Sequence, residues 1–465
     1  MSSHPVDTQE KALKVNLDPR RYGSFAEIGA GQEVVRWFFR VGGAAGTVAK
    51  SMSAYDMAVS DAVYGECKRY VARDRLQAML DIEQELNHTR LREDRGDDTA
   101  FFAFADTVSA RNFHGTNECH GWMGIKFQAH PRDEESQIII HVRMLDNENK
   151  SQQEALGIVG ANLVYGACFL HHEPQQLIDS LLDGLSTDRI EIDMIEFAGI
   201  AFRQVDNRIM SLHLVELGLS GAAMFSADGK VLQPSEVLRK KPVLIERGRF
   251  RPITHVNVDM LDCALKQFEA EDDIEEGETV TVMEMNMHNL KDGGRLDLKD
   301  FVSRSEILAT TGHTVMISDY AMFYRLAQYI SRYTQRRIGL AMGAGSLVQV
   351  FNPEHYHDLP GGILESFGRL FKNDLKLFIY PQKNTDGSLM KVDNLTIEGN
   401  LKHLYDYLVG HDNIVQIEGY REDILDVFSH NVLEMIRQGD KAWEDTVPEK
   451  VAAAIKKKKL FGYSA

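Results

Sequence analysis

The chain has 465 residues, of which 26% are charged and 43% hydrophobic, and its formal net charge is -17. This length exceeds what one compact core accommodates and indicates two or three domains of ordinary globular composition. The diffuse negative field argues against tracking along a nucleic-acid backbone as the main task, although a local basic pocket could still bind a small anion.

The cysteines and the start of the chain indicate the compartment. Cys67, Cys119, Cys168 and Cys263 are far apart and form no C-x-x-C pair. Such usage is typical of a reducing compartment and predicts neither a disulfide framework nor a zinc site. The first 23 residues lack the apolar stretch of a signal peptide, and no run approaches the roughly 18 apolar residues that cross a membrane. We therefore expect a cytoplasmic protein without membrane or nucleic-acid partners.

Residues 1–98 are expected to form a helical N-terminal region. A short apolar stretch, FAEI, precedes a helix-like segment, EVVRWFFRVGG, and a charged helical pattern runs from Tyr70 to Arg95. Between them, the segment from Gly42 to Gly65 is rich in Ala, Gly and Met. Such small-residue faces allow helices to approach closely, within a chain or between subunits, and they make a homo-oligomer an expected assembly.

Residues 99–187 are expected to form a small α+β region. AFFAFADTV, GWMGIKFQA and QIIIHVRML are short, rich in aromatic and β-branched residues and separated by polar breaks, which predicts three strands. A helical stretch follows from about Ser151 to Leu185.

Residues 188–399 carry the clearest pattern, that of an α/β core. About eight strands are predicted, several of them separated by helix-length segments: RIEIDMIEF, GAAMFS, PVLIE, THVNVDM, TVTVMEMNM, HTVMIS, RIGLAM and LKLFIYP. Alternating strands and helices indicate an α/β fold with a mostly parallel or mixed sheet. Eight strands would also allow a closed barrel, but their uneven spacing fits an open sheet at least as well. Residues 400–465 are expected to be a helical C-terminal region that ends in the lysine run 456–459.

Two of the predicted strands carry polar faces that suit catalysis. In THVNVDM, alternation places His255, Asn257 and Asp259 on one face. In VMEMNMH, the same alternation places Glu284, Asn286 and His288 on one face. If both faces line one cleft, two imidazoles and two carboxylates converge, which suits general acid–base catalysis or a divalent metal. The alternative is that both faces are the solvated side of a half-buried sheet.

Two further segments predict binding of an anion. In ERGRFRP, Arg247, Arg249 and Arg251 share one face of an extended chain and could present guanidinium groups to a phosphate or carboxylate. Otherwise they belong to a surface loop paired with acidic residues. In GLAMGAGSL, a strand is followed by Gly343, Gly345 and Ser346, and backbone N–H groups at such a turn can bind phosphate. No lysine stands at the Walker position, so a generic strand–helix turn is the other interpretation.

Two weaker motifs fail on spacing. GAGQEV has Val34 where a dinucleotide fingerprint requires glycine, so a helix cap is the better interpretation. FHGTNECHGW brings His114, Cys119 and His120 together, but adjacent strand residues point to opposite faces, which argues against a Cys–His nucleophile pair. This loop could still line a pocket.

Four stretches resemble a family of bacterial proteins of similar length: SFAEIGAGQEVVRWFFRVGGAAGTVAKSMSAYD, NECHGWMGIKF, QPSEVLRKKPVLIERGRFRPITHVNVDML and GGILESFGRLFKNDLKLFIYP. Its members carry labels such as TonB-dependent receptor and nicotinate-nucleotide adenylyltransferase. The first label implies a signal peptide and many barrel strands, and the second implies an H-x-G-H element; the chain has only His114-Gly115 and His120-Gly121. The resemblance therefore implies a cytoplasmic protein and assigns no catalytic residue.

Two hypotheses follow. In the first, the protein is an enzyme acting on a small phosphorylated or carboxylated metabolite, with His255, Asp259, Glu284 and His288 as catalytic or metal-binding groups and the three arginines holding the anion. In the second, it is a self-assembling homo-oligomeric scaffold that uses the segment from Gly42 to Gly65.

Overall fold

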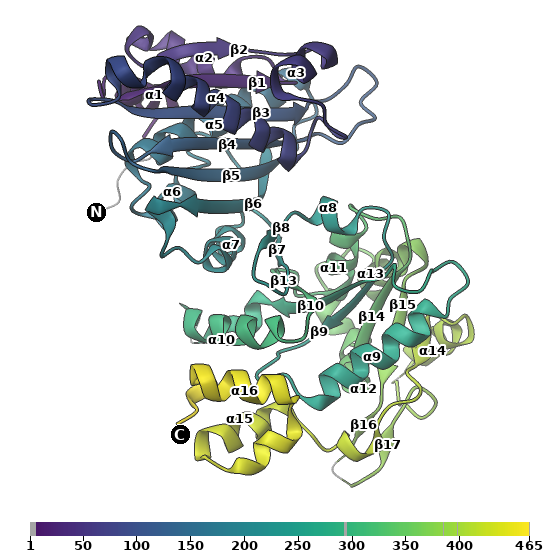
Figure 1. Ribbon diagram of the computed structural model, residues 1–465. Helices are drawn as coiled ribbons and strands as arrows, with labels where there is room; N and C mark the ends of the chain where they lie inside the picture. Colours follow the sequence, from purple (N-terminus) through teal and green to yellow (C-terminus); the bar gives the residue numbers. More distant parts are fainter. Residues whose placement is uncertain (1–5, 293–294, 385, 398, 465) are drawn as a thin grey trace. The chain divides into compact units, whose positions relative to one another are not determined.

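The computed structural model describes residues 6–292, 295–384, 386–397 and 399–464. The chain forms two compact units, Met1–Gly221 (unit 1) and Ala222–Ala465 (unit 2), each with its own sheet (Figure 1). The division therefore lies inside the 188–399 segment that the sequence indicates as one core. Among the described residues, no helix is long and apolar enough to cross a membrane.

Unit 1 is built on a six-stranded mixed sheet with the order β2-β1-β3-β4-β5-β6. β1 pairs in parallel with β2 and β3, and the remaining pairs are antiparallel. The predicted strands of region 99–187 are confirmed, and RIEIDMIEF joins them here as β6. The first 98 residues add two strands to their helices. The strands are β1 (Arg21–Ile28), β2 (Val48–Met52), β3 (Ala100–Ser109), β4 (His120–Gln128), β5 (Glu135–Met144) and β6 (Ile190–Gly199).

Helices cover both faces of this sheet. The buried face of the 23-residue helix α4 (Arg73–Arg95) carries Leu76, Met79 and Leu80 at helical spacing and packs on β1, β3 and β4. On the other face, α1, α2 and α5 enclose a large apolar core. The other helices are α1 (Thr8–Asn16), α2 (Glu33–Arg40), α3 (Met57–Tyr64), α5 (Asn149–Phe169), α6 (Pro174–Asp179) and α7 (Asn207–Glu216), with short 3-10 turns at Ala44–Gly46 and Ile200–Phe202.

Unit 2 is built on an eight-stranded sheet with the order β18-β15-β14-β9-β10-β13-β7-β8. The first six strands in this order are parallel, and the antiparallel hairpin β7–β8 extends the sheet beyond β13. The strands are β7 (Ala222–Phe225), β8 (Val231–Leu232), β9 (Val243–Arg247), β10 (Val280–Asn286), β13 (Thr314–Ser318), β14 (Ile338–Gly343), β15 (Lys376–Tyr380) and β18 (Ile414–Gln416). Two short hairpins lie outside the sheet: β11 (Lys291–Asp292) with β12 (Arg295–Leu296), and β16 (Gln382–Lys383) with β17 (Leu389–Met390).

The helices of unit 2 lie on both faces of the parallel strands. α9 packs on β9 and β14 (Figure 1). Its Phe268 ring meets Phe378 of β15 edge to face, with the ring centroids 5.8 Å apart. The opposite face forms an apolar core with residues of α11, α12, α13 and α14. The helices are α8 (Pro234–Leu238), α9 (His255–Glu269), α10 (Leu298–Ala309), α11 (Phe323–Ile330), α12 (Ala344–Val350), α13 (Gly362–Leu370), α14 (Leu401–Gly410), α15 (Ser429–Gln438) and α16 (Glu449–Lys458). Short 3-10 turns lie at Met287–Leu290, Pro353–Tyr356, Lys372–Asp374, Glu422–Ile424, Lys441–Thr446 and Leu460–Gly462.

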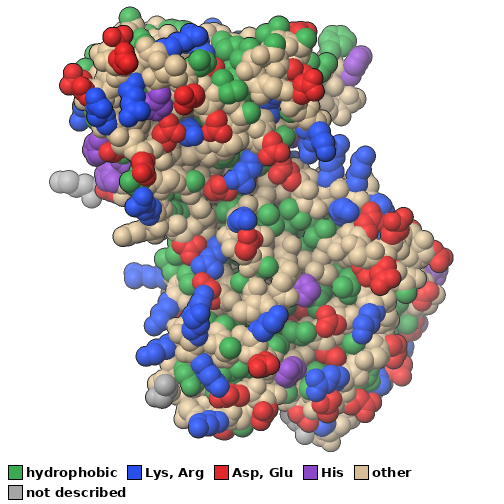
Figure 2. Space-filling model, in the orientation of Figure 1, with side chains coloured by type: hydrophobic (Ala, Val, Ile, Leu, Met, Phe, Trp, Pro, Cys, Tyr) green, Lys and Arg blue, Asp and Glu red, His purple; other side chains and the backbone are tan. Residues whose placement is uncertain are grey.

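The α/β fold class is confirmed, with one parallel-rich sheet and one mixed sheet. The sheet of unit 2 is open, since among the described residues no pairing joins its end strands β18 and β8, so the barrel alternative does not hold. Residues 400–465 contain the helices α14, α15 and α16 and also β18, which joins the sheet of unit 2. In the face drawn in Figure 2, acidic and basic side chains are intermixed over the surface, as expected of a diffuse rather than concentrated negative charge.

One predicted strand is wrong. THVNVDM begins the 15-residue helix α9, so His255, Asn257 and Asp259 do not share a strand face. The side chains of Thr254 and Asn257 form a reciprocal capping box at its first turn. Beyond it, Leu261, Ala264 and Phe268 continue at helical spacing on the buried side. His255 and Asp259 are instead neighbours at i and i+4 on one helix.

Candidate functional site

The strand order of unit 2 identifies one edge of the sheet as the place to search for a ligand. Numbered along the chain, the parallel strands β9, β10, β13, β14, β15 and β18 lie in the order 6-5-4-1-2-3. This is the doubly wound order in which the chain leaves β9 in one direction and returns on its other side with β14. Ligands in open sheets of this kind bind beyond the carboxyl ends of the two strands at the switch point. Here these are the segments after Arg247 and after Met342.

Arg247 ends β9 and is held by several partners. Its Nε and Nη2 donate to the two carboxylate oxygens of Glu284 on β10, at 2.6 and 3.1 Å. Further N–H groups donate to the carbonyl oxygens of Tyr320 and Ala321, and the guanidinium lies 4.7 Å from the Phe323 ring centroid. Glu284 is fully buried and also accepts a hydrogen bond from Ser318 Oγ at 2.5 Å. The Arg247–Glu284 ion pair therefore has a structural role at this edge of the sheet.

The other two arginines of the segment are placed differently. Arg249 is exposed, and no carboxylate of a described residue lies within ion-pair distance of it. Arg251 Nε lies 2.7 Å from Asp300 Oδ1. Asp300 is shared with the buried Arg304, whose Nη1 donates to the Arg249 carbonyl oxygen at 2.9 Å. Two guanidinium groups, those of Arg251 and Arg304, therefore share one carboxylate, and the exposed Arg249 lies two residues before Arg251, so the local charge is positive in a chain that is negative overall.

The turn after β14 is open on one side and occupied on the other. A Cβ atom at Gly343 would meet nothing within 4 Å, and Ser346 is exposed. The Gly345 N–H group, in contrast, already donates to Gln382 Oε1 at 3.1 Å. A Cβ atom at Gly345 would lie 2.5 Å from that oxygen, so a larger residue here would displace the Gln382 side chain. A phosphate at the turn would have to use Ser346 and the open side rather than the Gly345 N–H group.

His255 and Asp259 lie beside the ends of the next strands, β15 and β18. Asp259 accepts a hydrogen bond from Tyr380 Oη at 2.6 Å and one from the Arg421 backbone N–H at 3.0 Å. Burial and the positive charge of Arg421 lower the pKa of the half-buried His255, so its ring is neutral at pH 7. Along the chain, His255 and Asp259 come shortly after the Arg249–Arg251 segment, because α9 begins at His255.

Glu284 and His288 lie apart from this group, Glu284 on β10 and His288 in the 3-10 turn that follows it. His288 is exposed, with Nδ1 3.1 Å from Asn286 Oδ1 and 3.5 Å from Asp319. Among the described residues, no hydrogen bond or ion pair joins these two to His255 or Asp259. In the same part of the chain, no three His, Cys, Asp or Glu side chains are arranged to hold a metal ion. The four residues therefore do not form the single constellation that strand alternation suggested.

Sequence patterns missed a buried carboxyl at the centre of this edge. Glu246, next to Arg247 on β9, is fully buried, and its Oε1 accepts from Asn257 Nδ2 at 2.8 Å. Its Oε2 has no hydrogen-bond partner among the described residues. Burial raises the pKa of Glu246 to about 8, so the carboxyl is mostly protonated at neutral pH. The only sequence signal was an acidic residue inside an apolar strand.

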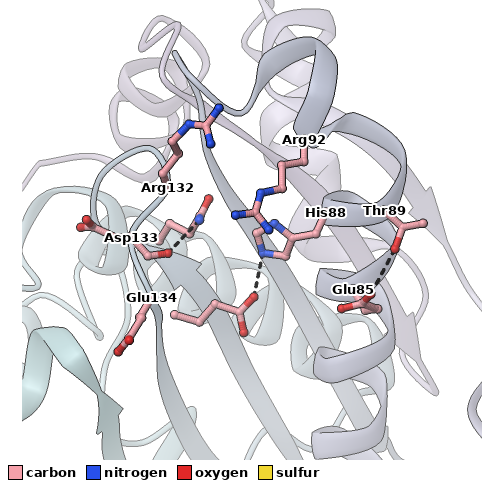
Figure 3. Close-up of a pocket in the computed structure, with 9 residues that line it drawn as sticks. Glu85, His88, Thr89, Arg92, Arg132, Asp133 and Glu134 are labelled. Atoms are coloured by element: carbon pink, nitrogen blue, oxygen red, sulfur yellow. Dashed lines mark hydrogen bonds and ion pairs between the residues drawn. The ribbon is translucent and has the colours of Figure 1, made fainter.

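Unit 1 contains a pocket of about 510 Å³ that no motif pointed to (Figure 3). It lies between α4 and the turn that joins β4 to β5. Within it His88 Nε2 lies 2.8 Å from Glu135 Oε1, and Arg132 at its rim pairs with Asp97. The lining carries the carboxyl groups of Glu85, Asp133, Glu134 and Glu135 against the two guanidinium groups of Arg92 and Arg132. Its lining residues are Glu85, His88, Thr89, Arg92, Gln128, Arg132, Asp133, Glu134 and Glu135.

Comparisons with known proteins leave the assignment to the geometry. No family model and no curated protein sequence matches the chain. Among solved structures, the competence/damage inducible protein CihA from Agrobacterium tumefaciens is 15% identical, with a TM-score of 0.26 over 36% of this chain and 99% of that chain. The nicotinic acid mononucleotide adenylyltransferase from Plasmodium falciparum, complexed with APC, is 11% identical, with a TM-score of 0.30 over 48% of this chain and 98% of that chain. Similarities this weak do not support any statement about function. The description of the fold of unit 2 rests on its strand order alone.

Proposed function

We propose that unit 2 binds a small phosphorylated or carboxylated molecule beyond the carboxyl ends of β9 and β14, and that the protein is an enzyme acting on it. The observation that carries the proposal is the topological switch point, because it juxtaposes the Arg249–Arg251 segment with the open turn at Gly343 and Ser346. The sequence predicted anion binding for both segments, although Arg251 and Gly343 are 92 residues apart along the chain.

The ion pairs of the three arginines indicate which of them could bind the ligand. Arg247 neutralises the buried Glu284 and is not available to a ligand. Arg249 is exposed, with no ion pair to any residue that the structure describes, and Arg251 shares Asp300 with Arg304. An anion beside these groups would gain charge-assisted hydrogen bonds without removing a partner from a buried carboxylate. Arg249 and Arg251 are therefore assigned to the ligand and Arg247 to the framework.

His255 is the acid–base group of this proposal. It stands at the first turn of α9, directly after the arginine segment, and its neutral ring can accept a proton at pH 7. Asp259, fixed by Tyr380 and by the Arg421 backbone, is assigned a positioning role on the same helix.

Titration calorimetry of the full chain tests the binding. The probes are inorganic phosphate, adenosine monophosphate and citrate, which separate simple phosphate, nucleotide and carboxylate ligands. We expect saturable binding of at least one, weakened about tenfold or more by Arg249→Gln or Arg251→Gln, since a hydrogen bond between charged groups contributes roughly 1.5–3 kcal/mol.

Arg239→Gln is the matched control, because Arg239 is also an exposed arginine of unit 2 but lies at the end of α8. Equal weakening by all three variants would mean non-specific attraction to positive charge and would overturn the proposal. The same conclusion follows if none of the three probes binds at millimolar concentration.

A specific observation also favours self-association. Around α3, four large apolar side chains are exposed: Tyr55, Met57, Val59 and Val63. β2 beside them is the end strand of the sheet of unit 1, with an unpaired edge. We propose that this surface joins two copies of the chain, which would explain its apolar character within the segment from Gly42 to Gly65.

Light scattering after size-exclusion chromatography tests the assembly. Met57→Lys with Val59→Lys is expected to convert a dimer or larger oligomer into a monomer. The control pair, Leu298→Lys with Leu364→Lys, places the same charges at exposed apolar positions of unit 2 and should leave the mass unchanged. A wild-type monomer at all concentrations would exclude self-association without affecting the ligand proposal.

A further inference from the structure

Three side chains on neighbouring strands of unit 1 form a hydrogen-bonded chain that the proposed function does not use. Asp193 Oδ1 on β6 lies 2.6 Å from His141 Nδ1 on β5. His141 Nε2 lies 3.0 Å from His120 Nδ1 on β4. Asp193 and His141 are each 1% exposed, whereas His120 is half-buried at the start of its strand. The chain thus runs from the interior to the surface.

The direction of the hydrogen bonds follows from the carboxylate. An ionised carboxylate only accepts, so His141 carries its proton on Nδ1 and its Nε2 is an acceptor. His120 must then donate from Nδ1, which leaves the lone pair of His120 on Nε2. The Trp122 ring, 4.9 Å from the His141 ring and nearly perpendicular to it, packs against this arrangement. The atom left at the outer end is a basic nitrogen.

The charges around His120 come from three elements. His141 and Arg143 lie on β5, Asp193 and Glu191 on β6, and Arg69 in the loop before α4. Arg143 pairs with Glu191 at 2.8 Å, whereas Arg69 is exposed with no carboxylate of a described residue within ion-pair distance. Burial, and then repulsion from His141 when that ring is itself protonated and from the two arginines, lower the pKa of His120 to about 4, and only Asp193 opposes them. His120 is therefore neutral across the physiological range.

We propose that Asp193, His141 and His120 form a proton relay in a second site, where His120 Nε2 is the general base toward a small molecule whose anionic group is held by Arg69. This site is independent of the proposed ligand site of unit 2. His120 would be the catalytic residue, and His141 and Asp193 would be positioning residues.

The step moves one proton and leaves no charge unbalanced. A water molecule or a substrate hydroxyl next to the anionic group gives its proton to His120 Nε2, and its oxygen keeps the bonding electron pair and becomes a hydroxide or alkoxide. The Nδ1 proton of His120 moves to His141 Nε2. The resulting imidazolium of His141 is then paired with the Asp193 carboxylate at 2.6 Å. The relay needs no oxidant, metal or cofactor.

Diethyl pyrocarbonate tests the lone pair, since it acylates only neutral imidazole. The full chain is treated at pH 7 and at pH 5, and the modification rate of each histidine peptide is measured by mass spectrometry. An ordinary histidine with a pKa near 6.5 should react roughly 20-fold more slowly at pH 5, as free N-acetylhistidine will show. His120 is expected to react at nearly the same rate at both pH values. A His120 that does not react at pH 7, or that slows as N-acetylhistidine does, would overturn the proposal.

Nitrogen-15 labelling of histidine tests the direction of the relay. His120 should show a proton on Nδ1 and none on Nε2, with its signal assigned by its loss in His120→Gln. In Asp193→Asn the carboxylate charge is removed while an acceptor oxygen is kept, and we expect His120 modification to slow at least threefold. Glu191→Gln, which removes a carboxylate from the same strand outside the relay, is the control and should change the rate less. A proton found on His120 Nε2 contradicts the relay even if Asp193→Asn misfolds.

Inorganic phosphate and acetate test the anion. Either ion at 20 mM is expected to slow modification of His120 in the wild-type chain and not in Arg69→Gln. Protection by phosphate alone would identify a phosphorylated substrate, and protection by acetate a carboxylated one. If neither ion protects, the assignment of Arg69 is wrong.

Discussion

Glu27 on β1 and Asp106 on β3 are direct neighbours in parallel register, and both carboxyl groups are buried. Glu27 accepts the Val34 and Val35 N–H groups at 2.9 and 3.0 Å and so caps α2 from inside the unit. Asp106 Oδ1 accepts the Ile28 N–H at 3.2 Å, while its Oδ2 has no partner among the described residues. Burial first, and then the charge of the other carboxyl or of Glu33, raises the pKa of each. Two adjacent carboxylates in this setting cannot both be ionised without a large cost.

This pair predicts that unit 1 loses stability as the pH rises. A carboxyl whose pKa is raised in the folded state binds more protons there than in the unfolded chain, so the free energy of unfolding falls above the ordinary carboxyl pKa of about 4. Asp106→Asn keeps the oxygen that accepts from Ile28 and removes one charge. We expect this variant to raise the free energy of unfolding at pH 8 by about 1–3 kcal/mol and to change it little at pH 5. Urea unfolding at both pH values measures this, and a variant less stable at pH 8 would contradict it.

Glu246→Gln makes the equivalent prediction for unit 2. The pKa of Glu246 is raised from 4.5 to about 8 by burial, so wild-type stability should fall between those two pH values. Gln keeps the oxygen that accepts from Asn257 and cannot ionise. We expect the midpoint of thermal unfolding to become independent of pH in this window and to exceed the wild-type midpoint at pH 8.5. A variant whose unfolding retained the wild-type slope would show that another group titrates.

Arg247→Ala should destabilise unit 2 strongly, since it leaves Glu284 buried without its partner. Breaking a buried ion pair in this way costs roughly 3–5 kcal/mol. Arg249→Ala, two residues away, removes an exposed side chain and should change the free energy of unfolding by no more than about 0.5 kcal/mol. Chemical unfolding of both variants separates a framework arginine from a ligand arginine. Similar losses in the two variants would refute that assignment.

Gly29 and Gly42 both have a positive φ, +98° and +81°, but differ in their surroundings. A Cβ atom at Gly29 would lie 1.9 Å from the Val108 carbonyl oxygen, whereas one at Gly42 would meet nothing within 4 Å. Gly42→Ala should therefore cost only the strain of the backbone, about 1 kcal/mol. Gly29→Ala adds displacement of β3 and is expected to cost at least about 3 kcal/mol. Thermal unfolding measures the difference in stability between the two variants. Equal midpoints would show that β3 can shift without loss of stability.

Strand prediction succeeded where apolar and β-branched residues dominate, as in Val243–Arg247 and Thr314–Ser318. It failed at His255–Met260 because a six-residue window of alternating residues fits period 2, while the helical period becomes visible only when Leu261, Ala264 and Phe268 are included. The T-x-x-N capping box at Thr254 was the local signal for a helix start, with Asn in the place usually taken by Glu or Gln.

The candidate sites show a different limit. Arg249 and Gly343 were predicted from local composition, but their proximity depends on strand order, which places β14 beside β9 rather than beside β13. The relay of His120, His141 and Asp193 spans 73 residues, and each member looks like an ordinary polar strand residue on its own. Pairing of β4 with β5 and of β5 with β6 creates it, and no single-segment pattern encodes such pairing.

The central strand β9 ends with two ionisable residues next to each other, and the charge of each is removed or compensated in a different way. Glu246 is kept protonated by burial, and Arg247 is neutralised by Glu284, its register partner on the neighbouring strand β10. The scaffold thus adds almost no charge of its own to the space beyond the strand ends, whose polarity is set by exposed loop residues such as Arg249. Replacing a few loop side chains should therefore invert ligand preference from anion to cation while the sheet stays intact, which makes unit 2 a suitable framework for engineering charge selectivity.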